Sequence, residues 1–356
     1  MIRAWYASSR PAAVLNSIRK TVTYNTKRHS NYRIASYRGY SKNVLDHDCR
    51  DKYTFNNRQA IYTSTSNYSY GKRYLTTEAA SQWTLDTVAK EIKMGSIENI
   101  IVLTGAGVST ASGLPDFRSP GSGLYDTLDD DEISDPMDIF DISFFDLNPH
   151  PFYRVAKHLH ASNYKPNYCH YFLKLLLEKN LLLRIYTQNI DGLERKAGIP
   201  EEKLIEAHGS FANATCRICK KRYTSSDIEG AILQQQVPRC KDDRCQGVIK
   251  PDVVFFGENL PYRFFTEQAT DFKLCDLLIV MGTSLQVYPF ASLANQVSSS
   301  VPRILINNEI VGTFGMYNKD VMEVGDIIKG LKKLTQSLSW ETHMECLLKK
   351  RYNLDS

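Results

Sequence analysis

A wholly aliphatic run, Ile100-Ile101-Val102-Leu103, leads through Thr104 into the glycine turn Gly105-Ala106-Gly107-Val108-Ser109. The run predicts a buried strand, and glycines at a strand-to-helix turn let the backbone approach a pyrophosphate held at a helix N-terminus. The third glycine of the dinucleotide-binding pattern is absent, because Thr110 stands in its place. The turn alone therefore leaves two interpretations open, a nucleotide site and a plain tight turn.

The segment after this turn is unusual in composition. Residues 112–121 are rich in Gly, Pro and Ser around a central Asp116-Phe117-Arg118. Polar loops beside a ligand site commonly carry function. We therefore expect residues 112–121 to form a mobile loop that lies over a bound cofactor.

Short aliphatic runs farther along the chain extend the pattern. Three of them predict further buried parallel strands, at Leu181–Tyr186, Leu277–Met281 and Arg303–Ile306. Apolar residues recur at helical spacing in three stretches, 83–92, 168–176 and 289–297. Strands that alternate with helices predict an α/β fold built on an open parallel sheet. Residues 213–250 break the alternation, because they are rich in Cys and basic residues, and we expect them to form an inserted module.

Four cysteines of that module are spaced as two pairs, Cys216-x2-Cys219 and the wider Cys240-x4-Cys245. Two thiolate pairs about 20 residues apart suit one tetrahedral Zn²⁺, and four protein ligands leave no open position, which favours a structural metal. Disulfides are the alternative, disfavoured in a chain that otherwise resembles an intracellular protein. The remaining cysteines are scattered and are interpreted as core or incidental thiols: Cys49, Cys169, Cys275 and Cys346.

Polar residues follow the strand expected at 181–186, in the tract Thr187-Gln188-Asn189-Ile190-Asp191-Gly192. The carboxyl ends of parallel strands are where open α/β sheets bind ligands, so function is favoured over a structural role for this tract. His208-Gly209 comes later, outside any strong helical pattern. Taken alone, His208 is more simply interpreted as a surface or packed histidine than as a catalytic one.

The net charge of +5 is unevenly distributed along the chain. Residues 1–45 hold nine of the 44 Lys and Arg and no Asp or Glu, so the rest carries 35 basic against 39 acidic side chains. A nucleic-acid-binding protein should carry its positive charge on the folded body, and composition argues against that class. No apolar run approaches the roughly 18–20 residues that span a bilayer.

The N-terminal segment has the composition of a targeting sequence. An acid-free stretch rich in Arg, Ser and Tyr predicts a mitochondrial transit peptide at 1–45, with a disordered basic arm as the alternative. Residues 46–80 show no apolar period and are expected to be a disordered linker.

Taken together, these motifs resemble those of one family, the sirtuins, which are NAD-dependent protein-lysine deacylases. The resemblance includes four further tracts: Phe255-Phe256-Gly257-Glu258, Gly282-Thr283-Ser284, Val287-Tyr288-Pro289-Phe290 and Asn307. All of the motifs keep the family's order across roughly residues 83–335. Tracts such as Lys250–Glu258 are most similar to the mitochondrial class I members.

The resemblance implies a catalytic domain over residues 81–352. Its expected parts are a Rossmann-like parallel-sheet large domain and a small zinc-binding domain inserted into it, behind a disordered N-terminal presequence. The implied reaction transfers the acetyl group of acetyl-lysine to ADP-ribose, with NAD as co-substrate, and releases nicotinamide and deacetylated lysine. The alternatives are an NAD-dependent protein mono-ADP-ribosyltransferase and a nucleic-acid-binding zinc module. A dehydrogenase is disfavoured, since nothing in these segments is committed to hydride transfer.

The resemblance also implies roles for single residues. His208 is the implied general base, a role that suits an unperturbed pKa of about 6.5, and Asn189 and Asp191 complete the catalytic set. The implied cofactor-binding residues are Gly105, Ala106, Gly107, Asp116, Phe117, Arg118, Tyr125, Gln188, Asn189, Ile190, Asp191, Gly282, Thr283, Ser284, Asn307, Glu309 and Ile327. The implied zinc ligands are Cys216, Cys219, Cys240 and Cys245.

The substrate is implied to bind as an extra strand over an apolar tunnel. The implied substrate-binding residues are Phe140, Ile190, Val254, Phe256, Gly257, Glu258, Leu285 and Val287. No basic side chain stands among the tunnel positions, which favours acetyl or longer neutral acyl groups over succinyl, whose carboxylate would be buried unpaired. We expect acetylated proteins as partners, a monomer in the mitochondrial matrix, and neither specific nucleic acid nor membrane binding.

Overall fold

The computed structural model describes residues 83–114, 135–159 and 164–354 of the 356-residue chain. The chain divides into two units, Met1–Arg73 and Tyr74–Ser356, and every described residue belongs to the second. The expected transit peptide and most of the linker lie outside the described residues. So do four residues implied in cofactor binding, Asp116, Phe117, Arg118 and Tyr125.

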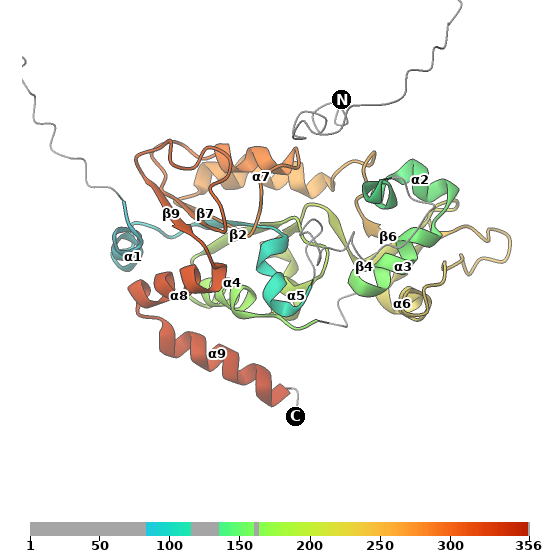
Figure 1. Cartoon of the computed structure of the whole chain (residues 1–356), viewed down its shortest axis with the longest axis horizontal. Coiled ribbons are helices and arrows are strands. Elements are labelled where there is room, and N and C mark those ends of the chain that lie inside the picture. Colours follow the sequence, from blue (N-terminus) through green and yellow to red (C-terminus); the bar gives the residue numbers. More distant parts are fainter. Residues whose placement is uncertain (1–82, 115–134, 160–163, 355–356) are drawn as a thin grey trace, which may run out of the picture. The chain divides into compact units, whose positions relative to one another are not determined.

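A six-stranded parallel sheet forms the larger part of the fold, in the order β3-β2-β1-β7-β8-β9 (Figure 1). Its strands are β1 (Ile100–Thr104), β2 (Leu182–Thr187), β3 (Leu204–Glu206), β7 (Leu277–Met281), β8 (Arg303–Asn307) and β9 (Asp320–Val324). The four strands expected from aliphatic runs are confirmed, with ends that differ by no more than a residue. The aliphatic pattern missed β3 and β9, which are short or mixed in composition and lie at the two edges of the sheet.

Helices cover both faces of this sheet (Figure 1). Successive strand residues point to opposite faces, and in β1 the pair Ile100 and Val102 packs in one apolar cluster while Ile101 and Leu103 pack in another. The first cluster includes residues of α1 (Leu85–Lys93), α4 (Tyr168–Glu178), α8 (Ile327–Leu338) and α9 (Glu341–Leu354). The second includes residues of α7 (Tyr262–Leu274) and η8 (Phe290–Asn295). Parallel strands covered on both faces form the expected Rossmann-like layer structure.

Two of the three expected helical stretches are α-helices, α1 and α4, whereas the stretch at 289–297 contains only the short 3₁₀-helix η8. The Ser292 hydroxyl donates to the Pro289 carbonyl at 2.7 Å. Such side-chain bonds compete with the α-helical pattern, and the Ser292 N–H also donates to Pro289 with 3₁₀ spacing.

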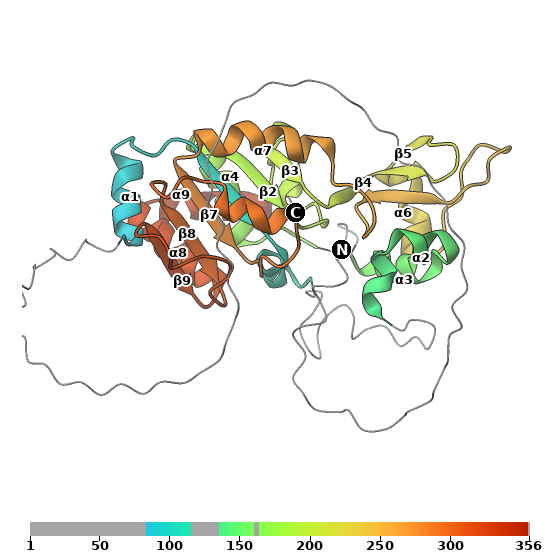
Figure 2. The same cartoon turned by 90° about the horizontal axis from the view of Figure 1, so that it is seen from above.

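A second sheet is antiparallel, in the order β5-β4-β6. Its strands are β4 (Gly209–Cys216), β5 (Arg222–Thr224) and β6 (Ile249–Val253). Helices α2 (Ile142–Leu147), α3 (His150–Leu159) and α6 (Ser225–Leu233) lie beside it (Figure 2), and residues of the short helix η5 (Pro136–Phe140) share its apolar core. The inserted module is thus confirmed as a separate sheet. Its apolar core also takes in Phe145 and Phe152 from earlier in the chain, which the sequence pattern did not attach to it.

The remaining short helices are η2 (Ala106–Val108), η3 (Thr110–Ser112), α5 (Leu193–Lys196) and η7 (Glu201–Lys203). Among the described residues, no helix is both long enough and apolar enough to cross a bilayer.

The strand order reverses at β1, which has β2 on one side and β7 on the other. At such a point an open α/β sheet leaves a crevice at the carboxyl ends of its strands. The Gly105 turn follows β1, the Gln188–Asp191 tract follows β2, and the Gly282–Ser284 tract follows β7. The fold therefore brings these three segments to one edge of the sheet.

Candidate active site and metal centre

The turns after β1 and β7 meet through glycines. A Cβ on Gly105 would lie 2.7 Å from the Gly282 carbonyl oxygen, and one on Gly107 would lie 2.8 Å from the Gly282 Cα. Gly282 has φ +64°, a conformation that side chains rarely adopt. The Gly107 N–H donates to the Gly282 carbonyl at 2.9 Å, so this amide is engaged within the protein. The three glycines thus let the two turns pack directly against each other, and this pair of turns at the crevice is called the glycine floor below.

Gln188, the first residue after β2, carries a polar atom without a partner. Its Nε2 is buried and makes no hydrogen bond within the described part of the structure, while its Oε1 lies 3.5 Å from the Thr283 hydroxyl. Leaving a buried donor unpaired costs about 1–3 kcal/mol. An acceptor on a bound ligand would satisfy this donor. The adjacent glycine floor presents backbone to which the ligand could lie close. Both features fit a dinucleotide such as NAD.

Asn189 and Asp191 form one buried network with Ser109. The Ser109 hydroxyl donates to Asp191 Oδ2 at 2.7 Å and accepts from Asn189 Nδ2 at 3.2 Å. Asn189 Nδ2 also donates to the Gly105 carbonyl at 3.1 Å, and Asp191 Oδ1 accepts from the Leu193 N–H at 2.9 Å. Two of the implied catalytic residues are therefore brought together and anchored to the glycine turn.

His208 lies in the turn between β3 and β4, beside Gln188. Its Nδ1 is 3.0 Å from the Gln188 carbonyl oxygen. Because a carbonyl only accepts, Nδ1 carries the proton and Nε2 keeps its lone pair. Burial lowers the pKa of His208, and the bond to Gln188 opposes this effect. The imidazole is neutral near pH 7, which is the state that a general base requires.

Residues implied in substrate binding lie on segments that meet near His208. The Val254 N–H donates to the His208 carbonyl at 2.8 Å, and the Phe256 N–H donates to the Phe140 carbonyl at 2.7 Å. Phe140 and Ile190 are buried in the same apolar cluster, with Phe256 packed against it. The structure thus joins the expected tunnel residues to the segment that carries the expected base.

Glu258 and Gly257 end the first of the expected peptide-binding segments. Glu258 Oε2 accepts from Lys250 Nζ at 2.8 Å and from the Phe255 N–H at 3.0 Å. Lys250 is buried and also donates to the Val253 carbonyl at 2.6 Å. The Lys250 charge is therefore compensated by Glu258.

The second expected peptide-binding segment, Leu285 to Val287, follows β7. Leu285 is buried and has φ +49°. Its N–H donates to the Thr283 hydroxyl at 3.1 Å, and that bond holds the turn. Ser284, between them, is exposed.

Residues implied on the adenosine side occupy the same edge of the sheet. Asn307 ends β8, is buried, and donates from Nδ2 to the Glu309 carbonyl at 2.9 Å. Ile327, also buried, begins α8 directly after β9. The carboxyl ends of parallel strands lie on one side of the sheet. Asn307 and Ile327 therefore lie on the side that bears the crevice.

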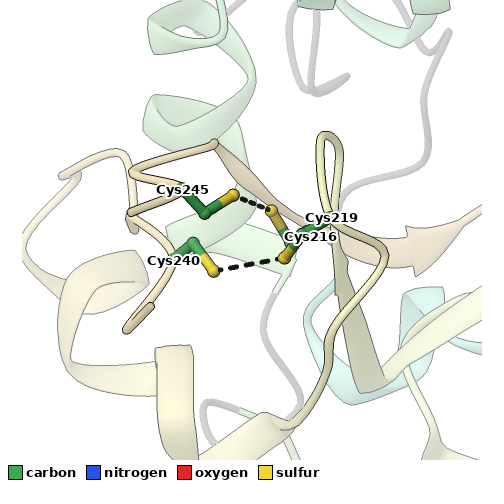
Figure 3. Close-up of side chains that lie close together, drawn as sticks. All are labelled: Cys216, Cys219, Cys240 and Cys245. Atoms are coloured by element: carbon green, nitrogen blue, oxygen red, sulfur yellow. Dashed lines mark hydrogen bonds between the residues drawn. The ribbon is translucent and has the colours of Figure 1, made fainter. Parts of the chain in front are cut away.

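The antiparallel sheet, with the helices and loops around it, is called the small unit below. Its four cysteines converge on one point (Figure 3). Cys216 and Cys245 have their Sγ atoms 3.6 Å apart, as do Cys219 and Cys240. All four Sγ atoms lie within 4.8 Å of one another. A tetrahedron with Zn–S distances of about 2.3 Å has sulfur–sulfur edges of about 3.8 Å, so the cluster fits one zinc ion.

The wide second pair closes through a tight turn. The Cys245 N–H donates to the Asp242 carbonyl at 2.9 Å, and the Asp242 carboxylate accepts from the Arg244 N–H at 3.1 Å. The Tyr223 hydroxyl lies 3.0 Å from Cys240 Sγ, and its hydrogen bond lowers the pKa of that thiol to about 7. The x4 spacing is therefore accommodated, and Tyr223 favours the thiolate that a metal binds.

Sequence reasoning missed several polar residues around this network, namely Thr104, Ser109, His170 and Glu194, all of which are buried. Thr104 and Ser109 stand within the strand and turn that first indicated the fold. His170 lies inside a predicted helix, and Glu194 follows Asp191 by three residues. A polar residue in an apolar or site-forming stretch was the available signal, but its burial could not be read from the pattern.

The fold and the site define a nucleotide-binding α/β protein with an inserted four-cysteine module. Residues 105–289 match the Sir2 family. The chain is 49% identical over 277 residues to NAD-dependent protein deacetylase sirtuin-3 of Mus musculus, covering 77% of this chain and 82% of that one. It is 46% identical over 264 residues to NAD-dependent protein deacetylase hst2 of Schizosaccharomyces pombe, covering 74% and 79%. It is 42% identical over 315 residues to NAD-dependent protein deacetylase sirtuin-2 of Danio rerio, covering 83% and 81%. The chain belongs to the Sir2 family, as its motifs predict.

Proposed function

We propose that this protein is an NAD-dependent protein-lysine deacetylase. The observation that carries the proposal is the neutral His208, whose Nδ1 is anchored on the Gln188 carbonyl while Nε2 keeps its lone pair. The relatives matched at 42–49% identity are named as NAD-dependent protein deacetylases. When bound, NAD would supply the ADP-ribose that receives the acetyl group and the nicotinamide that leaves.

In this proposal His208 is the general base. Nε2 accepts a proton from the ribose hydroxyl system, while the Gln188 carbonyl keeps the other ring proton on Nδ1 and fixes the orientation of the ring. The same carbonyl stabilises the imidazolium that forms, because a hydrogen bond from a charged donor is stronger than one from a neutral donor.

Asn189 and Asp191 orient the ligand. Asn189 would hold the ribose or its water, and Asp191 would bind the nicotinamide carboxamide. Both side chains are already fixed by Ser109 before any ligand arrives. They therefore lose little conformational freedom on binding.

The glycine floor and the residues around it would hold NAD. Gln188 offers its unpaired Nε2. Gly105, Gly107 and Gly282 would contribute by letting the two turns pack closely, since the Gly107 amide is engaged within the protein. The further proposed contacts are Ala106, Ile190, Thr283, Ser284, Asn307, Glu309 and Ile327. Asp116, Phe117, Arg118 and Tyr125 would complete the site from outside the described residues.

We infer that the substrate is an acetylated protein, bound as an extended peptide between residues 254–258 and 285–287. The acyl-lysine stem would pass over the apolar Phe140 and Ile190. Because the Lys250 charge is compensated by Glu258, it is not offered to an acidic acyl group. Neutral acyl groups are therefore favoured.

The four-cysteine cluster would hold one structural Zn²⁺. Its sulfur atoms fit a closed tetrahedral site, which leaves no position for a substrate or water. The metal would stabilise the small unit and take no part in the reaction.

We further propose that residues 1–45 direct the protein to the mitochondrial matrix, because they hold nine basic residues and no acidic one. Deleting residues 1–75 should abolish import in a cell-based fractionation and leave deacetylation by the purified protein intact. Unchanged import of the shortened chain would contradict this assignment.

The function is tested by incubating the full chain with NAD and an acetylated peptide. Nicotinamide, deacetylated peptide and O-acetyl-ADP-ribose should form in equal amounts. Transfer of radiolabel from NAD to protein without loss of acetyl groups would contradict the proposal and indicate a mono-ADP-ribosyltransferase. The control is His343→Ala. His343 is a partly exposed residue of α9 that pairs with Glu178 of α4, and neither residue belongs to the proposed site.

A further inference from the structure

A second buried carboxyl group lies next to Asp191. It belongs to Glu194 in α5, and the two residues are only 4% and 1% exposed. Ligand-type atoms of Asp191, Glu194 and His170 lie within 4.8 Å of one another. The proposed reaction assigns no role to Glu194 or His170. Two carboxyl groups this close and this buried will not both ionise unless a cation compensates them.

No Lys or Arg forms an ion pair with either carboxyl group within the described residues. Arg195, the neighbour of Glu194, pairs with Glu206 at 2.8 Å. Lys196 influences Asp191 through space, but its ammonium group donates to the Tyr164 carbonyl at 3.1 Å. Among the described residues, the charge of a second carboxylate therefore has no ion-pair partner.

His170 does not supply a positive charge either. Its Nδ1 accepts the Asn167 N–H at 3.2 Å, so that nitrogen carries no proton. The single ring proton is on Nε2, which faces the Ser109 hydroxyl at 3.5 Å. Burial lowers the pKa of His170 to about 3, and the ring is neutral at physiological pH.

The hydrogen bonds show which carboxyl group keeps a proton. Asp191 accepts two short bonds, from Ser109 at 2.7 Å and from the Leu193 N–H at 2.9 Å. Glu194 accepts a longer bond from the Thr104 hydroxyl at 3.3 Å, and hydrogen bonds from Thr187 and from its own backbone N–H also favour its charged form. Burial raises the pKa of both carboxyl groups, and for Glu194 burial and the charge of Asp191 outweigh its hydrogen bonds. Because the two short bonds to Asp191 favour its charged form, and that charge disfavours a second one beside it, Asp191 is the ionised member of the pair and Glu194 the protonated one.

We propose that Glu194 is a positioning residue whose proton leaves Asp191 as the one negative charge of this cluster, oriented by Ser109 and Leu193 for the ligand. The proposal rests on the proposed function, because the ligand in question is the nicotinamide end of NAD. It assigns Glu194 no contact with that ligand.

The polar and titratable groups around this pair come from every neighbouring element. They are Thr104 of β1, His170 of α4, Thr187 of β2, Asp191 after β2, Arg195 and Lys196 of α5, and Glu206 of β3. Burial first, and the charge of Asp191 second, raise the pKa of Glu194 to about 8. The proton is therefore held below about pH 8 and lost above it. Once it is lost, repulsion between the carboxylates should displace Asp191 and weaken NAD binding.

The proton can be observed directly by infrared spectroscopy of the full-length protein. At pH 7 the wild type should show the C=O stretch of a protonated carboxylic acid, and this band should be absent from Glu194→Gln. Glu178→Gln is the control, since it removes a partly exposed carboxyl group of α4 that pairs with His343 at 2.8 Å, outside the buried cluster, and it should keep the band. A wild-type spectrum without the band, or a band that persists in Glu194→Gln, would overturn the proposal.

Calorimetric titration with NAD tests the effect on Asp191 without any turnover. From pH 7 to pH 9.5 the wild-type Kd should rise about tenfold, which is about one pKa unit of interaction between the carboxylates. Glu194→Gln keeps the shape and neutrality of the protonated residue, so its Kd should stay within about twofold of its own pH 7 value. Glu194→Ala should bind NAD weakly at both pH values. Because Gln keeps the bulk of Glu, the difference between the pH profiles of the wild type and Glu194→Gln isolates the effect of the proton from that of bulk.

Parallel pH profiles of the wild type and Glu194→Gln would overturn the positioning role even if the infrared band is present. If neither protein deacetylates peptide although NAD binding shows the expected pH dependence, the proposed function fails and the role of Glu194 stands. Neither readout depends on deacetylation, so the two failures can be told apart.

Discussion

The two sheets of this protein are stabilised in different ways. In the parallel sheet β1, β7 and β8 are buried along their whole length, and its core draws on helices from both ends of the described chain. In the antiparallel sheet β5 has only three residues, and the core is joined to a cluster of four cysteines. Area buried on two faces stabilises the first sheet through many small contributions. With the proposed zinc bound, the second would depend on a few bonds to one ion, so the same kind of mutation should affect the two sheets very differently.

The largest difference should follow the loss of one zinc ligand. Structural zinc contributes about 10–16 kcal/mol of apparent binding free energy in small zinc-binding peptides. Cys216→Ser should therefore release the metal and remove hydrogen-exchange protection from β4 and β6, while β1 and β7 remain protected. Metal analysis and hydrogen exchange measure the two parts of this expectation.

Cys275→Ser is the matched control, because Cys275 is a buried thiol of the parallel-sheet core. It should keep its zinc and its exchange pattern in the small unit. Retention of metal and of protection in Cys216→Ser would show that the antiparallel sheet is as self-sufficient as the parallel one.

The next effect concerns chemistry at His208, in the turn that joins the parallel sheet to the antiparallel one. Removing a general base typically costs about 10²–10⁴ in rate. His208→Ala should lose deacetylation by about that factor, because the ring supplies the lone pair that accepts the proton. Nicotinamide exchange into NAD, which needs only the first step, should survive better. Product formation and thermal melting, measured on one sample, separate loss of catalysis from loss of fold. A His208→Ala protein that melts normally and deacetylates at the wild-type rate would exclude His208 as the general base.

A smaller effect is expected from a buried ion pair in the parallel sheet. Arg303 and Asp320 are 0% and 1% exposed in their side chains and lie 2.7 Å apart. Breaking such a pair costs about 3–5 kcal/mol, because one charge stays buried. Asp320→Asn should lower stability in denaturant titration and leave the zinc content unchanged.

Glu323→Gln is the comparison for that variant, since it removes a carboxylate of the same strand whose partner, Lys333, is largely exposed. The loss should be about 0–1 kcal/mol. Equal losses in the two variants would mean that burial does not set the strength of ion pairs in this sheet.

An effect smaller than that of Asp320→Asn is expected at the support of the metal site. Tyr223→Phe removes the hydroxyl 3.0 Å from Cys240 Sγ and keeps the ring in the core. Loss of a hydrogen bond to a metal ligand typically costs about 10–100-fold in affinity. Competition with a chelator should show zinc leaving Tyr223→Phe faster than the wild type, with the parallel sheet unaffected. An unchanged zinc affinity would exclude Tyr223 from the support of the site.

The parallel sheet was readable from the sequence because its central strands are buried on both faces. Continuous aliphatic runs follow from that burial, and Leu277–Met281 was predicted with its observed ends. The edge strand β9 is only partly covered and mixes Asp and Glu with apolar residues, so it gave no such signal. Membership of the small unit was not readable either. Phe145 belongs to it because the centroid of its ring lies 5.3 Å from that of Phe255, a contact that exists only in the folded chain.

The candidate site divides in the same way. Residues after β1, β2 and β7 could be placed at one edge, because parallel strands end together. The four cysteines could be grouped from their spacing. The protonation of Glu194 could not be anticipated, because it depends on burial and on which hydroxyls face the carboxyl group.

The meeting of Gly107 and Gly282 has a consequence for how the chain is made. The bond between their backbones joins turns on either side of the whole antiparallel sheet in sequence, so no nascent chain ending before Gly282 can form it. Until β7 is synthesised, β1 has one paired edge and one bare edge, and bare edges attract other strands. The nucleotide floor is thus among the last features to form during translation. An interrupted chain would expose its most aliphatic strand to aggregation, and a chaperone would protect it best along that edge.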